Sequence, residues 1–254
     1  MTKIPWTDEA VNFYSWNCTP VGKECVHCFA KVRAGQFGFK PSAGADFIGV
    51  PVWRDKAYDE LRKVAPGSTV FINTHSDTFH PQVPVDYPPR IFSLAKQRRD
   101  LLFLILTKRP EMAAEYGGAL VFPPNLWMGV SVGIQSALHR LDVLRSLPVT
   151  GGRFVSFEPL LEDLGTVDLT GINWVIVGAE TGEVRRPFDE MWGRALRDQC
   201  QAAAVPFWFK SCGGMFPDTA PELDGQLWRQ IPEAFRAHRE QHRVIVETQQ
   251  TALF

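Results

Sequence analysis

The sequence predicts an α/β protein built as a partial or complete parallel (β/α) barrel of about six or seven strands, with a C-terminal cap. Two observations predict this fold. Short apolar runs alternate with longer amphipathic segments, which is typical of repeated βα units and a parallel sheet. Each apolar run is followed by small or polar residues, which a parallel barrel would gather at one rim. A small doubly wound sheet is the alternative that the same alternation allows.

The predicted strands are short runs rich in β-branched and aromatic residues, as buried strands are. They cover residues 11–16, 69–73, 101–107, 126–132, 153–157, 173–178 and 206–210. Helical patterns occupy residues 25–37, 52–64, 88–99, 134–147 and 189–203. From Gly213 onward, turn residues precede a short helical pattern, so we expect a barrel domain over 1–212 and a C-terminal extension over 213–254 packed on it.

Composition and charge limit the classes of protein to consider. The 254 residues have a net charge of −1, with 45% hydrophobic and 22% charged residues, as in ordinary globular proteins. The chain contains no block of Lys and Arg residues, so nothing in its composition suggests a broad phosphate-binding surface. The N-terminus has no apolar signal core, and no apolar run is long enough to span a membrane. We therefore expect a cytoplasmic protein without a membrane partner. An odd number of cysteines, five, speaks against a disulfide framework there.

Three of the five cysteines fall close together, at Cys18, Cys25 and Cys28. A closed zinc site would need a fourth ligand. His27 is poorly placed for this, whereas His75 or His80 could supply it from a distance. A redox pair formed by the C-x-x-C spacing would leave Cys18 unused.

An iron–sulfur cluster with three protein ligands is the third interpretation. Cysteine thiolates hold such clusters, and three of them on a four-iron cube leave one iron open. An open metal position is typical of a catalytic site. Pro20 and Gly22 suit an irregular loop around a bulky cube, and the amides that open a helix at Cys25 would favour its negative charge.

The residues that follow the predicted strands are candidates for the same site. Cations could bind a carboxylate or a phosphate, serine and carboxylate groups could bind ribose hydroxyls, and a glycine turn lets the backbone approach a flat ligand. The candidates are Ser76 and Asp77 after the second run, Lys108 and Arg109 after the third, Ser131, Glu158, Gly178 and Glu180 after the next three, and Cys212 after the last.

These motifs, in this order, resemble the radical S-adenosylmethionine (SAM) superfamily. The usual cysteine spacing there is C-x3-C-x2-C, whereas this chain resembles a phage- and prophage-borne branch with a C-x6-C-x2-C-[YF]-A loop. The matching segments are residues 4–12, 73–80, 106–110, 127–132, 153–161, 174–182 and 205–210. The family often has Gln-Trp-Gly after the lysine of the last strand. Here the residues are Ser211, Cys212 and Gly213, a departure consistent with a substrate-specific change.

The resemblance implies a mechanism. Cys18, Cys25 and Cys28 would hold a [4Fe–4S] cluster whose open iron is chelated by SAM. One electron, from a donor such as flavodoxin or ferredoxin, would cleave SAM to methionine and a 5′-deoxyadenosyl radical that abstracts hydrogen from the substrate. The implied roles place Ser76 and Asp77 at the methionyl end, Lys108 or Arg109 at its carboxylate, Ser131 and Glu158 near the ribose, and the backbone at His27 and Gly178 near the adenine. Glu180 belongs to the glycine turn that could approach a flat ligand.

The substrate is less closely defined. Cys212 could be a rim thiol that donates a hydrogen atom or carries a radical, or simply a small buried residue. The phage setting of the relatives suggests modification of a nucleobase in DNA, for example isomerisation of an amino-acid adduct on thymidine (a hypermodification), in the host cytoplasm. A repair lyase resembling spore photoproduct lyase is an alternative. A zinc-binding nucleic-acid module without enzymatic activity is the rival from another class.

Overall fold

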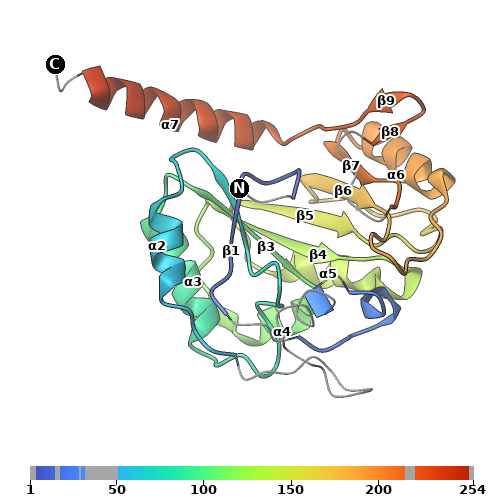
Figure 1. Ribbon diagram of the computed structural model, residues 1–254, viewed down its shortest axis with the longest axis horizontal. Coiled ribbons are helices and arrows are strands. Elements are labelled where there is room, and N and C mark those ends of the chain that lie inside the picture. Colours follow the sequence, from blue (N-terminus) through green and yellow to red (C-terminus); the bar gives the residue numbers. More distant parts are fainter. Residues whose placement is uncertain (1–3, 15–17, 29, 32–50, 215–220, 252–254) are drawn as a thin grey trace.

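A seven-stranded parallel sheet is the centre of the computed structural model, which describes residues 4–14, 18–28, 30–31, 51–214 and 221–251 (Figure 1). Its strands follow one another in chain order, and every neighbouring pair is parallel. They are β1 (Glu9–Val11), β2 (Thr69–Ile72), β3 (Leu102–Thr107), β4 (Leu126–Ser131), β5 (Gly152–Phe157), β6 (Trp174–Gly178) and β7 (Phe207–Ser211).

The sheet curls into a half-barrel. Over the described residues β1 and β7 do not pair with each other, so the partial parallel barrel that the sequence predicts is confirmed and a complete one is not. The doubly wound alternative is wrong, because its strand order would reverse partway across the sheet.

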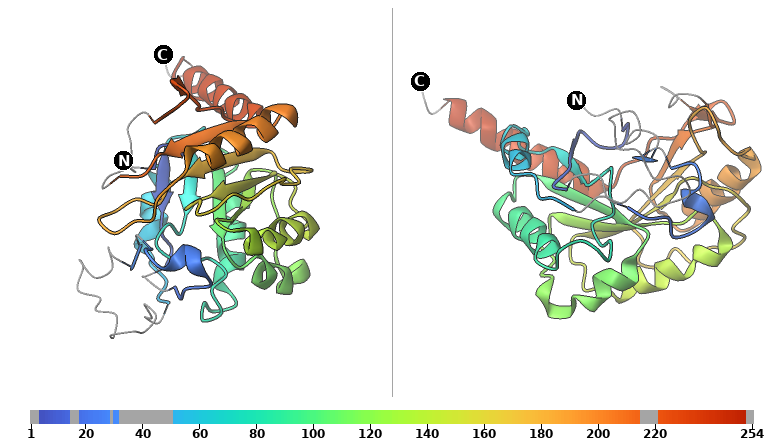
Figure 2. Two further views of the ribbon diagram at one scale, coloured as in Figure 1. Left: turned by 90° about the vertical axis from the view of Figure 1, so that its right-hand side faces the viewer. Right: turned by 60° about the horizontal axis from the view of Figure 1, so that its bottom comes forward.

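Helices cover the outer face of this sheet (Figures 1 and 2). They are α2 (Lys56–Arg62), α3 (Tyr87–Gln97), α4 (Pro110–Glu115), α5 (His139–Ser146) and α6 (Glu190–Ala202), with 3-10 turns η1 (Lys23–Cys25), η2 (Gly117–Ala119) and η3 (Gln135–Ala137). Four predicted helical segments correspond to α2, α3, α5 and α6. The segment predicted over 25–37 is described only to residue 31, where helix covers 30–31; the remainder lies outside the described residues.

Two details differ from the sequence prediction. The first strand is Glu9–Val11 rather than 11–16, and Tyr14 instead forms an isolated antiparallel bridge with Trp53; residues 15 and 16 lie outside the described residues. The helical pattern over 189–203 places Met191 on the same face as Leu196 and Cys200, which are buried, but 66% of Met191 is exposed in the first turn of α6, next to the N-cap Asp189.

Aromatic side chains fill the interior of the half-barrel at the amino ends of the strands. The cluster contains Trp6, Phe71, Trp127, Phe154, Trp174, Trp208 and Phe235. Glycines provide the space: a Cβ at Gly129 would lie 2.5 Å from the Phe154 ring, and one at Gly152 would lie 2.6 Å from the Trp127 indole. Large and small residues therefore alternate across the interior, and this end is closed by packing.

The C-terminal segment packs on this closed end. It contains a hairpin of β8 (Glu222–Leu223) and β9 (Gln226–Leu227) and a long helix, α7 (Glu233–Thr251), whose side chains are described to His242. Residues 228–230 hydrogen-bond to the outer edge of β7 and so cover an edge strand. Helix α7 contacts the loops that precede the first strands, through Arg239 to Asp8 (2.8 Å) and His238 to the Asp100 carbonyl (3.0 Å). No helix in the described part of the chain is both long and apolar enough to cross a membrane.

Candidate metal centre at the carboxyl ends of the strands

A cavity of about 250 Å³ lies at the open, carboxyl end of the strands. Eleven of the thirteen predicted site residues line it: Cys18, Cys25, His27, Cys28, Ser76, Asp77, Lys108, Arg109, Ser131, Glu158 and Glu180. The remaining two, Gly178 and Cys212, are not part of its lining. The parallel sheet explains this gathering, because side chains that follow successive strands meet at one rim.

The three clustered cysteines are free thiols, each partly exposed at this cavity. Cys25 ends η1, and Cys18 and Cys28 both pack against Ala30. Within the described residues, no three His, Cys, Asp or Glu side chains are arranged to hold a metal ion. The donor chemistry fits an iron–sulfur cube, because each thiolate binds a different iron and the three sulfurs need not converge on one point.

The Cys18 thiol lies in a charged and buried setting. Burial and then the negative charge of Asp77 raise the pKa of Cys18 to about 11, while Arg109 opposes the shift. The Arg109 Nη1 lies 3.7 Å from the Cys18 sulfur. The unbound thiol is therefore protonated at neutral pH, and a metal that binds it would displace a proton.

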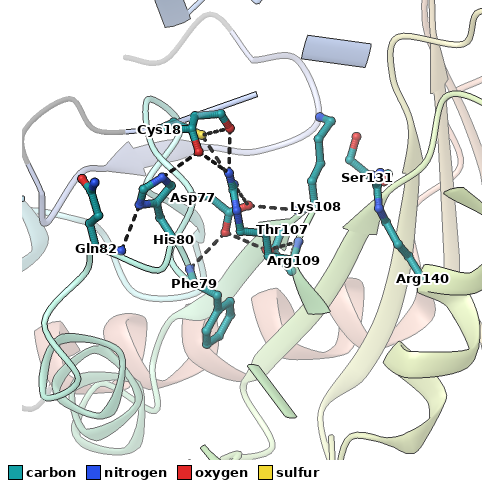
Figure 3. Close-up of polar contacts among 11 residues, drawn as sticks. Cys18, Asp77, Phe79, His80, Gln82, Thr107, Lys108, Arg109, Ser131 and Arg140 are labelled. Carbon is teal, nitrogen blue, oxygen red and sulfur yellow. Dashed lines mark hydrogen bonds and ion pairs between the residues drawn. The ribbon is translucent and has the colours of Figure 1, made fainter. Parts of the chain in front are cut away.

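Asp77 is the centre of a buried network behind Cys18 (Figure 3). It accepts hydrogen bonds from the Thr107 hydroxyl (2.6 Å) and from the backbone amides of Phe79 and Lys108 (both 3.0 Å), and it pairs with Arg109 at 3.3 Å. Both of its carboxylate oxygens are thus engaged by the protein. Asp77 lines the cavity, but its contacts make it a support for Arg109.

Two predicted residues near this network have polar groups without a partner among the described residues. Lys108 lines the cavity, and its ammonium group forms no ion pair with another described residue. The Ser76 hydroxyl is buried and has no hydrogen-bond partner within the described part of the chain. A bound carboxylate or phosphate would satisfy the Lys108 ammonium, and a polar ligand would satisfy the serine.

The opposite wall holds a second ion pair. Glu158 pairs with Lys210 at 2.7 Å and accepts a hydrogen bond from the Ser156 hydroxyl at 2.9 Å. The Ser131 hydroxyl donates to the Glu158 carbonyl at 2.9 Å. Gly178 makes room for this pair, because a Cβ there would lie 2.6 Å from Glu158 Oε1. The space at Gly178 is therefore occupied by a protein carboxylate.

Glu180 and Cys212 mark the far side of the rim. Although burial by itself raises it, the hydrogen bonds and charge of Arg186 lower the pKa of Glu180 below its ordinary value. Arg186 also donates to the Lys23 carbonyl at 2.8 Å, which ties the loop after β6 to η1. Cys212 lines a different, neighbouring hollow together with Glu183 and Arg186, and its sulfur lies 3.7 Å from the Glu222 carbonyl.

Several lining or supporting residues were not among the sequence predictions. Lys210 could have been found, because it follows the inward-facing Trp208 by two positions on β7. Glu24 and Arg140 gave no signal: they are 116 residues apart, and a single charged residue in a turn or on a helix usually faces solvent. They form a buried pair at 2.7 Å, with the Glu24 side chain fully buried. The predicted distant ligands differ in place: His75 lines the cavity, whereas His80 is buried and contacts the Thr19 hydroxyl at 3.0 Å.

Comparison with known proteins identifies a family but not an activity. The chain belongs to the family described as "Protein of unknown function (DUF5131)", which matches residues 1–232. The match includes the whole sheet and all three clustered cysteines. No curated protein and no solved structure matches the chain.

Proposed function

We propose that the protein is a radical SAM enzyme in which Cys18, Cys25 and Cys28 hold a [4Fe–4S] cluster and the adjoining cavity binds SAM. One observation carries the proposal: three free thiols from a single short loop line a cavity at the carboxyl ends of a parallel half-barrel. Polar residues from the ends of the other six strands line the same cavity, so a ligand bound there would contact both the thiols and these residues.

The bound cluster and SAM supply the chemistry, namely one-electron cleavage of SAM to a 5′-deoxyadenosyl radical that removes hydrogen from an unactivated carbon. The protein binds, orients and excludes water. Lys108 is the cation available to the SAM carboxylate. Ser76 lines the same cavity, and its buried hydroxyl is available as a polar contact. The closed aromatic interior below the cavity shields its floor from solvent.

The substrate that we propose is a nucleobase, in DNA or as a nucleotide, modified by an isomerase or lyase type of reaction. Isomerisation of an amino-acid adduct on thymidine is one form of it, and a repair lyase of the photoproduct type is the other. The floor of the cavity supports a flat ring as ligand, because Trp6, Phe71 and Leu106 line it beside the Lys210–Glu158 pair. An electron donor such as flavodoxin or ferredoxin completes the reaction.

Anaerobic reconstitution with iron and sulfide tests the proposal. We expect a brown protein with about four irons per chain, and production of 5′-deoxyadenosine once SAM and a reductant are added. A variant with Cys18, Cys25 and Cys28 replaced by alanine should lose both properties. Cys212→Ala is the matched control, because this cysteine does not line the cavity, and it should keep the iron content.

The rival class, a zinc-binding nucleic-acid module, gives the opposite result. A colourless wild-type protein that holds one zinc, takes up no iron and forms no 5′-deoxyadenosine would refute the radical SAM proposal.

A separate experiment tests the proposed substrate class. Nucleoside mass spectrometry compares DNA from cells with the active gene and from cells without it, and a modified nucleoside found only with the active gene is the expected result.

A further inference from the structure

Two buried arginines hold the loop that carries the three thiols, which we call the thiol loop (residues 18–28). Arg109 follows β3 and contacts the Cys18 end, whereas Arg140 lies on α5 and contacts the Cys25 end. Each is paired with a buried carboxylate, Asp77 for Arg109 and Glu24 for Arg140. The two ends of the loop are therefore anchored separately to the barrel.

The contacts of Arg109 concentrate on Cys18 and its neighbour. Its Nη2 donates to the Thr19 carbonyl at 2.6 Å and to the Thr19 hydroxyl at 3.0 Å, and its Nη1 donates to the Cys18 sulfur at 3.7 Å (Figure 3). Its side chain is only 9% exposed, so water does not screen these interactions strongly. Asp77 orients the guanidinium group from behind at 3.3 Å.

The contacts of Arg140 are of a different kind. Its Nη1 donates to Glu24 and to the Ser131 carbonyl, both at 2.7 Å, and Glu24 also accepts from the Gly133 amide at 3.3 Å. These contacts fix the backbone of η1 beside the end of β4. Arg109, in contrast, reaches a sulfur atom that the proposed cluster would use.

This difference assigns a role to Arg109. Hydrogen bonds to ligand sulfurs and nearby positive charge stabilise the reduced form of an iron–sulfur cluster, which carries one more negative charge, and they raise its reduction potential. An arginine cannot lose its charge in a protein, so the effect persists at every working pH. We propose that Arg109 is a positioning residue that anchors the Cys18 end of the thiol loop and raises the reduction potential of the cluster bound there. The effect on the reduction potential rests on the proposed function, because it needs the cluster, whereas the anchoring of the loop does not.

Three variants separate the sulfur contact from the anchoring. Arg109→Gln removes the charge and the sulfur contact, while Asp77 keeps its hydrogen bonds from Thr107, Phe79 and Lys108. Arg109→Lys keeps the charge and is the second variant if the glutamine protein folds poorly. Thr19→Val is the matched control, because it removes the hydroxyl contacts of residue 19 and leaves the Arg109 contact with the sulfur.

The first measurement is an EPR-monitored redox titration of the reconstituted full-length protein. We expect a more negative reduction potential in Arg109→Gln, a smaller shift in Arg109→Lys, and the wild-type potential in Thr19→Val. A wild-type potential in Arg109→Gln would overturn the assignment. An equal shift in Thr19→Val would overturn it as well, because loop geometry would then account for the change.

The second measurement is hydrogen exchange in the metal-free full-length protein. We expect the backbone amides of the thiol loop between Cys18 and Cys25 to exchange faster in Arg109→Gln than in the wild type. Unchanged exchange would refute the anchoring. If the wild-type protein takes up no iron, the proposed function and the effect on potential fail together, and the exchange experiment still decides whether Arg109 holds the loop.

Discussion

Carboxylates at the cavity are paired with basic side chains of the protein itself. Asp77 pairs with Arg109, Glu158 with Lys210 and Glu180 with Arg186, and in each pair the carboxylate side chain is at most 13% exposed. Removing one partner of a buried pair leaves an uncompensated charge, which is strongly destabilising. These pairs therefore give the cavity wall a fixed shape, whereas the Lys108 ammonium has no ion pair among the described residues.

A substitution at Gly178 tests whether the Glu158–Lys210 pair fixes the shape of the cavity wall. We expect Gly178→Ala to push Glu158 away from Lys210, since the new Cβ would lie 2.6 Å from Glu158 Oε1, and to cost about 1–3 kcal/mol of unfolding free energy. Chemical denaturation measures the loss, and isothermal titration with SAM measures the effect on the cavity. Gly118→Ala is the control, because a Cβ there meets nothing within 4 Å. Equal stability of the two variants would show that Glu158 moves aside at no cost.

At the scale of elements, the sequence predicts the later strands better than the first. Each apolar run from 69–73 to 206–210 matches an observed strand to within one residue at either end, because a buried parallel strand has a continuous hydrophobic run. The apolar residues of the run 11–16 that are described are also buried, but Phe13 and Tyr14 bury their rings against Trp53 instead of extending the strand. Hydrophobicity alone cannot distinguish these two kinds of burial.

The site residues likewise divide into those that the sequence predicts and those that it does not. Its strand-end residues follow from the parallel sheet, which brings them to one rim whatever the loops do. The Glu24–Arg140 pair does not follow, because it depends on how η1 meets α5 in space. Cys212 shows that a residue can follow a strand without lining the cavity. It follows β7 but lines a neighbouring hollow, and the pairing between β6 and β7 shifts by one residue at Gly178.

One aromatic side chain of α7 packs into the closed end of the half-barrel. Phe235 is 1% exposed and packs against Trp127 and Trp174, with ring centroids 4.7 Å and 5.2 Å apart. We expect Phe235→Ala to cost about 3–5 kcal/mol of unfolding free energy, because it leaves a cavity in the closed end of the half-barrel. Denaturant titration measures this cost. The neighbouring Arg236→Ala removes an exposed side chain and should change stability by no more than about 0.5 kcal/mol. A similar small loss in both variants would show that α7 does not stabilise the barrel.

At the scale of the whole molecule, the half-barrel has one closed and one open end. The aromatic interior and α7 close the amino ends of the strands, and the thiol loop and the strand-end residues surround the carboxyl ends. Stability and proposed chemistry are thus placed at opposite ends, as in parallel barrels generally. A change at the closed end should therefore alter stability without altering the ligands of the thiol loop.

The pH dependence of stability tests this separation. Burial chiefly, and then the neighbouring His242, lower the pKa of His238 below 6.5, although the Asp100 carbonyl and carboxylate oppose the shift. At this histidine the unfolded chain binds a proton more readily than the folded chain. The contribution of His238 to the unfolding free energy is therefore fully present above about pH 6.5 and is lost as the pH falls toward the folded pKa. We expect denaturation midpoints to fall between about pH 7 and pH 5. His238→Gln should flatten this slope, while the iron content of the reconstituted variant at neutral pH stays at the wild-type level. An unchanged slope would mean that another group controls the acid sensitivity, and a loss of iron would mean that the two ends are coupled.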